Sequence, residues 1–445
     1  MNRHVRTAAA ILLIAALYFG GGKAGLSLAS VNPSVTAVWP PTGIALAAVL
    51  LLGARVAPGI FIGAFLLNLK TAGTVSTSIG IALGNTLESL VAAWAVKRFA
   101  HGTNAFDRAR DVYIYMLVAA VLATMLSASI GVCVLCFGKL EQWANFYHVW
   151  VVWWLGDCVS AIVIAPLLIV WAIRPPPHLT IERVVEAACL LASLCVVFVG
   201  VFGGWSESAG HGYALEYAGI PVLLWAALRF QQRGAVTAAA ITSAIAIRGT
   251  LAGDGPFAPS SNGDAFIMLQ VFLGIIAVTA LVVAAVTSER MEAEESVRRS
   301  EARLRLGLDA GSTGTWDWDI VNNHVTWSDR VYEMHGLRPG EFGGRVEDFT
   351  KLVHPDDAAR VRRTIEQSIE QQTPYEIEFR VVHADGEARW LATRGRVYYD
   401  RAGRPLRMLG VTRDVTESKK AEEERTRLLE SERSARSEAE RANQM

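Results

Sequence analysis

Long apolar segments recur through the first two-thirds of the chain, and they constrain its fold more than any other feature. Between residues 5 and 287 the sequence is mostly Ala, Val, Leu, Ile, Gly and Trp, whereas charged residues become frequent from Ser288 onward. A helix needs roughly 17 to 25 apolar residues to cross the hydrocarbon layer of a membrane. Only helices and closed barrels satisfy their backbone hydrogen bonds there. The sequence therefore predicts a mainly α-helical, polytopic membrane bundle followed by a soluble part.

The number of spans follows from the apolar segments. The second and third candidates are short and are separated by the sequence GARVAPG, so they form either two spans or one re-entrant hairpin. We therefore expect eight to ten transmembrane helices. The candidate segments lie near residues 7–23, 41–54, 56–70, 79–97, 112–137, 147–172, 182–202, 213–230, 234–250 and 265–287.

The basic residues between these segments predict the orientation. With the N-terminus in the cytoplasm, eleven Lys and Arg residues fall in the inner connections and four in the outer ones. Positive charge is retained on the cytoplasmic side of a membrane. We therefore expect a multi-pass protein whose N-terminus and soluble part are both cytoplasmic. The net charge of zero argues against a nucleic-acid partner, which leaves membrane lipid as the expected surroundings.

Four polar side chains interrupt the predicted spans: Asn68, Asn85, Glu88 and Asp157. Polar groups are costly in hydrocarbon unless they face a partner or a cavity, so each marks a potential functional site. Asn85 and Glu88 are three residues apart and share one helical face. The set fits three interpretations, namely a hydrogen-bonded lock between helices, a pocket for a ligand or ion, and a proton pathway. Together with Trp39, these residues are the predicted membrane sensing pocket.

Five motifs in the apolar part resemble those of a known family. They are YFGGGKAGLSLA, VWPPTGIALAAVLLLG, PGIFIGAFLLN, GNTLES and WWLGDCVSAIVIAPLL, and they occur in the order typical of the first subtype of the MASE family. This family comprises integral-membrane sensor domains found in front of bacterial histidine kinases and diguanylate cyclases. The resemblance covers about residues 8–287 and implies a sensory domain over 1–287 in a bacterial cytoplasmic membrane.

The soluble part reads as a linker helix over 288–308 followed by an α+β domain over 309–418. Two strands, short helices, a longer helix and three further strands follow each other, which predicts a five-stranded antiparallel sheet with helices. The stretches GTWDWDI, LVHPDD, EFRVVHADGEARWL and GVTRDVTE resemble the PAS domains of bacterial sensor kinases.

Aromatic residues are expected to fill the PAS core or to line a small pocket. Relatives with flavin photochemistry need a cysteine, and residues 288–445 contain none. His335, His354 and His383 fall in turns or at helix edges, where we expect solvated side chains rather than haem ligands. We therefore expect neither haem nor flavin, and no metal. The aromatic residues in question are Trp316, Trp318, Trp327, Phe379 and Trp390.

The last segment, 419–445, is predicted to be a dimeric coiled-coil signalling helix. One apolar seam repeats every seven residues, while the second seam is poor, which favours a linker that can shift its register. Together with Asp414 and Thr416 at the end of the PAS domain, this seam is the predicted signal relay. Its members are Ala421, Leu428, Ala435 and Ala442.

These features predict the sensory module of a two-component histidine kinase. The stimulus would pass from the membrane domain through the PAS domain and coiled coil of a homodimer to a downstream kinase domain, and then to a response regulator. The residues contain no phospho-acceptor box, ATP-binding motif or GGDEF signature, so we assign no catalytic residue and expect the output domain to lie outside this sequence. The alternatives are the sensory half of a diguanylate cyclase and a secondary transporter with a regulatory PAS domain, for which an inverted repeat is not evident.

Overall fold

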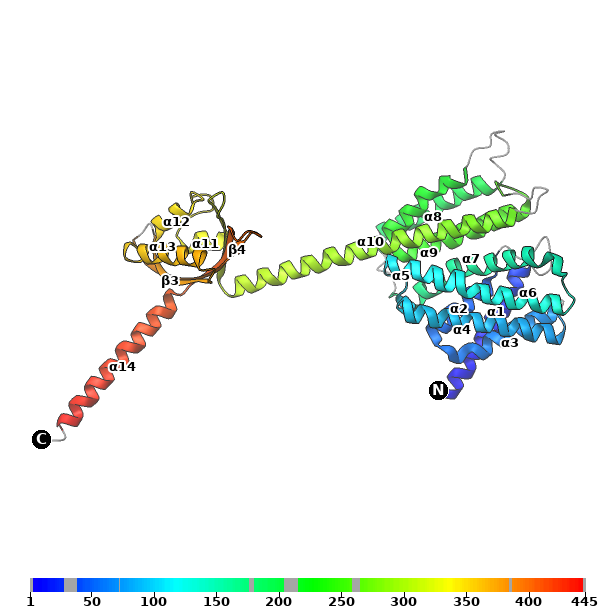
Figure 1. The fold of residues 1–445 in the computed structure, drawn as a ribbon, viewed down its shortest axis with the longest axis horizontal. Helices are drawn as coiled ribbons and strands as arrows, with labels where there is room; N and C mark the ends of the chain where they lie inside the picture. The colour runs from blue at the N-terminus through cyan, green and yellow to red at the C-terminus, as the bar shows by residue number, and fades with distance from the viewer. Residues whose placement is uncertain are drawn as a thin grey trace. The chain divides into compact units, whose positions relative to one another are not determined.

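The computed structural model describes residues 3–27, 38–71, 73–175, 180–203, 215–257, 265–383 and 386–442. The chain folds as two compact units, Met1–Glu294 and Glu295–Met445. The first unit is helical and the second contains a five-stranded sheet, which confirms the predicted fold class (Figure 1). Each unit has its own buried apolar core.

The described part of the membrane unit consists of helices and short helical turns. They are α1 (Arg3–Ser27), α2 (Pro40–Leu52), η1 (Ala54–Val56), α3 (Ala57–Thr71), α4 (Val75–Phe99), η2 (Gly102–Asn104), α5 (Ala109–Tyr115), the π-helix η3 (Met116–Ala123), α6 (Thr124–Phe137), η4 (Trp143–Asn145), α7 (Phe146–Ile173), α8 (Ile181–Phe202), η6 (Leu215–Gly219), α9 (Ile220–Ala252) and α10 (Ala265–Ala310).

Local sequence explains where two of these helices begin. Helix α2 starts at Pro40 and Pro41, as the sequence predicts, because the first turn of a helix needs no amide donor. Helix α4 starts after Thr74, whose hydroxyl accepts a hydrogen bond from the Thr77 amide, while the Thr77 hydroxyl accepts one from the Thr74 amide. This reciprocal pair is a capping box.

Seven helices of the described residues are long and apolar enough to cross a membrane. Two short segments explain part of the difference from the predicted eight to ten, because α2 and α3 have only 13 and 15 residues. The predicted spans 213–230 and 234–250 account for the rest, because they run together in α9. The number of spans remains a prediction.

Helix α9 reverses direction at Gln231, whose backbone is not helical (φ 52°, ψ −142°). A straight helix of 33 residues would be about 50 Å long. Nevertheless, Ile220 at its start and Phe257 beyond its end line the same cavity. Gly234 permits the turn, since a Cβ there would lie 2.2 Å from the Ala226 carbonyl oxygen. Helix α9 is therefore two arms that fold back on each other.

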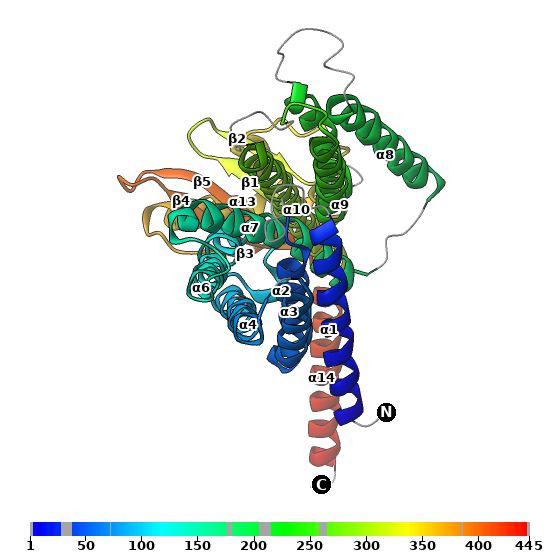
Figure 2. The ribbon, with the colours of Figure 1, turned by 90° about the vertical axis from the view of Figure 1, so that its right-hand side faces the viewer.

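Small residues let the membrane helices approach closely. Helix α2 packs against α1, α4 and α7, and α8 lies at the edge of the bundle beside α9 (Figure 2). A Cβ at Gly43 would lie 2.6 Å from the Ser160 carbonyl oxygen, and a Cβ at Gly59 would lie 2.4 Å from that of Ile11. These contacts bring α2 against α7 and α3 against α1.

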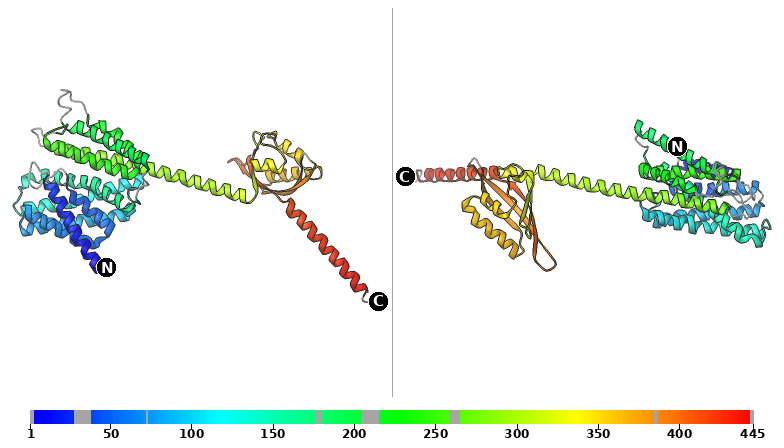
Figure 3. Two further views of the ribbon diagram at one scale, coloured as in Figure 1. Left: turned by 180° about the vertical axis from the view of Figure 1, so that it is seen from behind. Right: turned by 90° about the horizontal axis from the view of Figure 1, so that it is seen from above.

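The second unit contains one antiparallel sheet in the order β2-β1-β5-β4-β3. Helices α11, α12 and α13 cover one face of this sheet (Figure 3). Helix α14 leaves from the end of β5. The elements are β1 (Thr313–Asp319), β2 (His324–Trp327), α11 (Asp329–Met334), α12 (Val346–Leu352), α13 (Pro355–Glu370), β3 (Tyr375–Val382), β4 (Ala388–Tyr399), β5 (Pro405–Asp414) and α14 (Thr416–Ala442).

A pair of glycines shapes the core of the sheet. Gly395 on β4 and Gly410 on β5 are directly opposite each other, and Gly410 also pairs with Trp316 on β1. A Cβ on either glycine would lie less than 3 Å from the indole ring of Trp316. The absence of side chains at these two positions therefore leaves room for the indole ring.

Candidate functional site

Three of the four predicted polar residues of the membrane unit, Asn85, Glu88 and Asp157, meet in a buried cluster formed by five helices. Asn85 on α4 lies at its centre. Its side-chain nitrogen donates to the Tyr18 hydroxyl on α1 at 2.8 Å, and its side-chain oxygen accepts from the Ser127 hydroxyl on α6 at 2.7 Å. All three residues are less than 5% exposed. Asn85 therefore joins three helices through both ends of its amide.

Asp157 on α7 is bound to the first turn of α2. The Thr42 hydroxyl donates to Asp157 Oδ1 at 2.6 Å, and the Gly43 amide donates to the Ser160 hydroxyl at 2.9 Å. The first four amides of a helix have no partner within their own helix, and Gly43 carries one of them. The WPPTG motif thus supplies both a helix start and the donors that contact α7.

Glu88 and Asp157 leave two buried carboxyl oxygens without partners. Glu88 Oε2 and Asp157 Oδ2 make no hydrogen bond to any described residue. The two carboxyl groups interact with each other electrostatically, and the Ser127 hydroxyl interacts with both. A buried carboxyl with an unused oxygen carries a desolvation cost. The cluster therefore has unused capacity to bind a proton, a cation or a hydrogen-bond donor.

The π-helix η3 contributes backbone carbonyl groups that accept hydrogen bonds from side chains beside this cluster. A π-helix has irregular intrahelical bonding and is frequent at functional sites. The Ala120 carbonyl accepts from the thiol of Cys158 at 2.7 Å, and the Val121 carbonyl accepts from the Trp154 indole at 3.0 Å. Cys158 directly follows Asp157 in α7. The irregular segment is thus hydrogen-bonded to the turn that carries the buried carboxyl group.

Two residues of the predicted sensing pocket stand apart from the hydrogen-bonded cluster. Asn68 donates to the Ala64 carbonyl of its own helix and is only half-buried, so it does not take part in the hydrogen-bonded cluster. A side-chain amide can satisfy itself in this way on a single helix. Trp39 is half-buried, and its indole nitrogen lies near the Tyr18 hydroxyl without completing a hydrogen bond.

The sequence analysis did not identify four members of the cluster. Tyr18, Thr42, Ser127 and Ser160 are buried hydroxyl residues, and none of them is charged. Three of them lie within or beside the quoted motifs. Hydroxyl residues are common in membrane helices because they can bond to their own backbone, so their type alone did not mark them.

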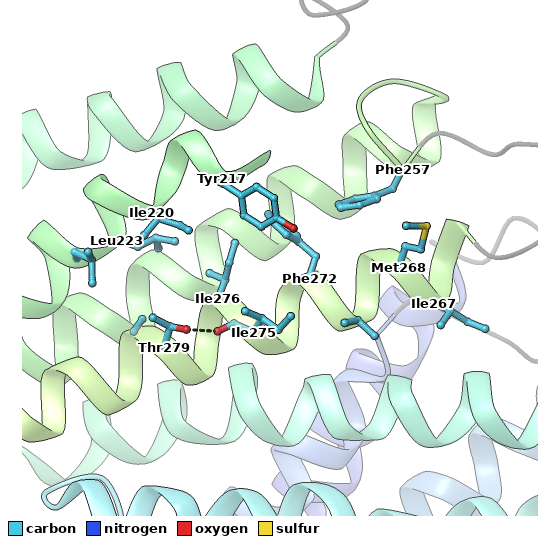
Figure 4. A pocket seen from close by; sticks show the side chains of 13 residues that line it. Tyr217, Ile220, Leu223, Phe257, Ile267, Met268, Phe272, Ile275, Ile276 and Thr279 are labelled. Atoms are coloured by element: carbon cyan, nitrogen blue, oxygen red, sulfur yellow. Dashed lines mark hydrogen bonds between the residues drawn. The ribbon is translucent and has the colours of Figure 1, made fainter. Parts of the chain in front are cut away.

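A separate apolar cavity of about 300 Å³ lies between α10 and the first arm of α9. Figure 4 shows Tyr217, Phe257 and Phe272 around it, with the Thr279 hydroxyl bonded to the Ile275 carbonyl. None of the predicted polar residues lines this cavity. Because its lining is almost entirely apolar and lies in a membrane span, the cavity suits hydrocarbon rather than a polar stimulus.

The PAS unit contains a smaller cavity of about 50 Å³ between its sheet and helices. Four of the five predicted aromatic residues line it, namely Trp316, Trp318, Trp327 and Phe379. Trp390 does not, so its predicted place in the core or pocket is wrong. Side chains alternate along a strand, and the fully buried Leu391 next to it faces the core. Trp390 therefore lies on the opposite face of the sheet.

Two of the three PAS histidines are buried, which corrects the expectation that all would be solvated. His335 is 3% exposed and His383 is 8% exposed. The His383 Nε2 atom lies 2.9 Å from the Met334 carbonyl oxygen, and its ring packs against Gly336. His354 behaves differently, because its side chain caps α13 by accepting from the Asp356 amide. His335 and His383 lie in turns, and the sequence alone does not show that these two turns pack against each other.

Trp390 takes part in the junction between the sheet and α14. Its amide donates to the Thr416 hydroxyl at 3.0 Å, and that hydroxyl donates to Asp414 Oδ1 at 2.6 Å. Lys419 lies over the Trp390 ring, 5.7 Å from its centroid, and pairs with Glu378 at 2.8 Å. The predicted relay residues Asp414 and Thr416 thus anchor the first turn of α14 to β4.

A second cation links this junction to α13. Arg380 also lies over the Trp390 ring, 5.5 Å from its centroid, and donates through its backbone amide and Nε to Asp357. Burial alone would raise the pKa of Asp357, but the hydrogen bonds from Arg380 and Arg360 outweigh it and lower that pKa to about 2. A charged chain therefore runs from α13 through β3 and β4 to α14.

The predicted apolar seam of α14 is only partly described. Ala421 and Leu428 are exposed, as a surface for a partner helix would be. The side chains of Ala435 and Ala442 lie outside the described residues. The coiled coil therefore remains a prediction.

Comparison with known proteins agrees with the two-unit architecture. A PAS-fold family model matches residues 324–412, and the MASE1 family model matches residues 10–291. These matches define the class, which is a polytopic membrane sensor domain followed by a PAS domain. The chain belongs to the MASE1 family.

Individual relatives match mainly in one part of the chain. The probable diguanylate cyclase DgcE of Escherichia coli K12 is 27% identical over 136 residues, covering 31% of this chain and 12% of that protein. A blue-light-activated histidine kinase of Brucella ovis is 31% identical over 134 residues, covering 30% of this chain and 26% of that protein. The chain thus spans about a quarter or less of the length of these relatives.

Solved structures are also similar to this chain. Among them is a sensory box histidine kinase/response regulator from Burkholderia thailandensis E264, which is 31% identical. The match covers 29% of this chain and 98% of that one, with a TM-score of 0.27.

Proposed function

We propose that this chain senses a stimulus in the membrane and transmits it to an output domain of a bacterial signalling protein. The observation that carries this proposal is the continuity of α10. This helix runs unbroken from Ala265 inside the membrane unit to Ala310, and β1 begins at Thr313. A helix transmits displacement or rotation along its axis, because its hydrogen bonds make it a rigid element. A change in the bundle can therefore reach the PAS domain.

The output that we favour is a histidine kinase acting on a response regulator. The similar proteins include both a histidine kinase and a probable diguanylate cyclase, so the cyclase is the alternative. The relay would pass through α14 in a homodimer formed by the PAS domains and the C-terminal helices. The exposed Leu428 and Leu429 of α14 support a helical partner.

The orientation proposed from the sequence is a cytoplasmic N-terminus and a cytoplasmic PAS domain in the inner membrane. The excess of basic residues in the inner connections supports it. The strongly charged second half of α10 cannot enter hydrocarbon, which supports a PAS domain outside the bilayer.

The proposed stimulus site is the buried cluster of Glu88 and Asp157. A ligand or ion that occupies the unused carboxyl oxygens shifts the equilibrium between two packings of α2, α4 and α7, provided that it binds them unequally. Coupling energies between sites are typically about 1–3 kcal/mol, or about 5- to 150-fold in an equilibrium constant. Replacement of one carboxyl group should change the resting output by a factor in this range.

The test fuses the chain to a histidine-kinase core and, in parallel, to a cyclase core, each reconstituted in lipid vesicles. We expect Glu88→Gln and Asp157→Asn each to change basal phosphorylation at least about fivefold without loss of folded protein. Asn68→Ala is the control, because Asn68 is also a polar residue of a predicted span but lies outside the cluster. Unchanged output in both carboxyl variants would refute the assignment of the site. Activity of the cyclase fusion alone would favour the alternative output.

A further inference from the structure

An arginine at the reversal of α9 lacks a charged partner. Arg233 follows Gln231 closely and is half-buried, and its Nη2 atom donates to the Arg174 carbonyl oxygen at 2.7 Å. Its Nε atom is buried and makes no hydrogen bond to any described residue. No Asp or Glu of the described chain forms an ion pair with Arg233, and residues 175–180, which follow Arg174, contain neither acid. A guanidinium has five N–H donors and stays charged, so binding capacity remains at this position.

The two neighbouring arginines are already neutralised. Arg174, directly after the end of α7, forms an ion pair with Asp107. Arg229, four residues before Arg233, donates through Nε to both carboxylate oxygens of Glu186 at 2.7 and 2.8 Å. Arg233 is therefore the uncompensated charge in this group of three arginines.

Arg233 lies at the end of the bundle from which α10 leaves. The side-chain amide of Gln231 donates to the Met291 sulfur on α10 at 3.2 Å. Gln232 is fully buried and donates to the Phe106 carbonyl oxygen at 3.2 Å. Since the charged part of α10 cannot enter hydrocarbon, this end of the bundle lies at a membrane surface. In the proposed orientation it is the inner surface.

Trp171 on α7 indicates the depth of Arg233 in the membrane. Its side chain is 51% exposed, and the Arg233 guanidinium lies over its ring, 5.0 Å from the centroid. The indole nitrogen donates to the Thr237 hydroxyl at 3.0 Å, which holds the ring in place. Tryptophan is enriched at membrane–water interfaces, where its ring sits at the level of the headgroups. The guanidinium on this ring therefore lies where a lipid headgroup can reach it.

The charges around Arg233 fit a group with a single negative charge. Arg174 and Asp107 neutralise each other. Arg108 and Glu292 also interact electrostatically with Asp107, and their charges are opposite, so Arg233 leaves one positive charge. A phosphodiester carries one negative charge, and its two free oxygens match the planar fork of a guanidinium. Arg174 Nε is also buried without a partner in the described chain, and it adds a further donor.

We propose that Arg233 binds the phosphate group of an anionic phospholipid at the inner surface of the membrane. The phosphate oxygens accept from Arg233, with Arg174 Nε as a further donor, and an acyl chain lies beside the exposed ring of Trp171. A zwitterionic headgroup carries an ammonium group that Arg233 repels, so the site selects a headgroup without one. The bound lipid ties the end of α7 to the reversal of α9, beside the point where α10 leaves the bundle. This site is separate from the buried cluster of Glu88 and Asp157.

The test measures lipid binding to the full chain in detergent micelles by native mass spectrometry. The probe is phosphatidylglycerol, and phosphatidylcholine with the same acyl chains is the matched control that carries an ammonium group. We expect phosphatidylglycerol to bind at least about tenfold more tightly than phosphatidylcholine. A separate arm adds millimolar inorganic phosphate to the complex with phosphatidylglycerol, which a site for a lipid should retain.

Two variants assign the contact. Arg233→Gln removes the uncompensated charge and should weaken the binding of phosphatidylglycerol at least about tenfold. Arg229→Gln is the matched control, because Arg229 is the same residue type on the same helix but is already paired with Glu186. It should change the binding about twofold or less. Thermal melting in the same detergent confirms that each variant is folded.

Three results would overturn the proposal. They are equal binding of the two lipids, equal binding of phosphatidylglycerol by the two arginine variants, and its displacement by inorganic phosphate. The second result would mean that general surface charge attracts the lipid, and the third that the site takes a dissolved anion. The first and third are measured on the unchanged protein, so they decide the question even where a variant fails to fold. Because Glu88 and Asp157 are intact in all of these proteins, failure here leaves the proposed stimulus site untouched.

Discussion

His335 should make the stability of the PAS unit fall steeply below neutral pH. The folded pKa of about 4 lies well below the value of 6.5 for an exposed histidine. Between pH 6.5 and 4, His335 therefore binds a proton in the unfolded chain but not in the folded unit. Folding stability is then lost as the pH falls from about 6.5 to 4, and the loss levels off below 4.

The expected size follows from the shift. Each pKa unit corresponds to about 1.4 kcal/mol, so lowering the pH from 7 to 4.5 should remove about 2 to 3 kcal/mol. In urea, with an m-value of about 1.5 kcal/mol per molar for a domain of this size, the unfolding midpoint should fall by roughly 1.5 M. Asp357 contributes little in this range, because its own stabilisation is lost only between about pH 3.8 and pH 2.

The assay is pulse proteolysis of the PAS unit across a urea series, with the full chain in nanodiscs at several pH values. His335→Phe is the decisive variant, because phenylalanine keeps an aromatic ring stacked on Trp327 and cannot take up a proton. It should leave stability at pH 7 nearly unchanged, because removal of the unpaired Nε2 atom is offset by loss of the bond between Nδ1 and the Val331 carbonyl. It should also abolish most of the pH dependence. An equally steep loss of stability in this variant would show that the burial of His335 is not the cause.

Three further predictions follow from single contacts. Thr42→Val removes the hydroxyl that donates to Asp157 Oδ1 and should lower the stability of the membrane unit in detergent by about 1–3 kcal/mol. Thr42→Ser keeps a hydroxyl and should retain the stability of the unchanged protein. Equal melting temperatures of the two variants would contradict the role of this bond. Gly410→Ala places a Cβ 2.2 Å from the Trp316 ring and should destabilise the PAS unit by about 2 kcal/mol in urea, while Gly307→Ala, with open space around it, should be neutral or mildly stabilising. Trp390→Ala should speed hydrogen exchange in residues 416–420 about tenfold, because it removes the surface under Lys419, and Tyr398→Ala on the same strand should leave that exchange unchanged.

The sequence by itself determined the architecture of this protein. Apolar length distinguishes a membrane helix from other helices, and strand alternation with turn residues distinguishes a sheet, so both signals are local. The WPPTG helix start, the order of the PAS strands and the membrane depth of Glu88 and Asp157 could all be derived in this way. Asn85 was found for the same reason, because an amide inside an apolar run is visible without knowing its neighbours.

The tertiary structure decided which of these residues meet. Asn68 and Asn85 are the same residue type within predicted spans, yet one bonds to its own helix and the other joins Tyr18 to Ser127. Likewise, Trp390 differs from the other PAS aromatics only in the face of the sheet on which it lies. The partner of a polar side chain is set by residues far apart in the chain, for example 115 positions between Thr42 and Asp157. Local sequence patterns do not show which residues meet across such sequence separations. The unpaired buried atoms that indicate function could therefore be identified only in the folded structure.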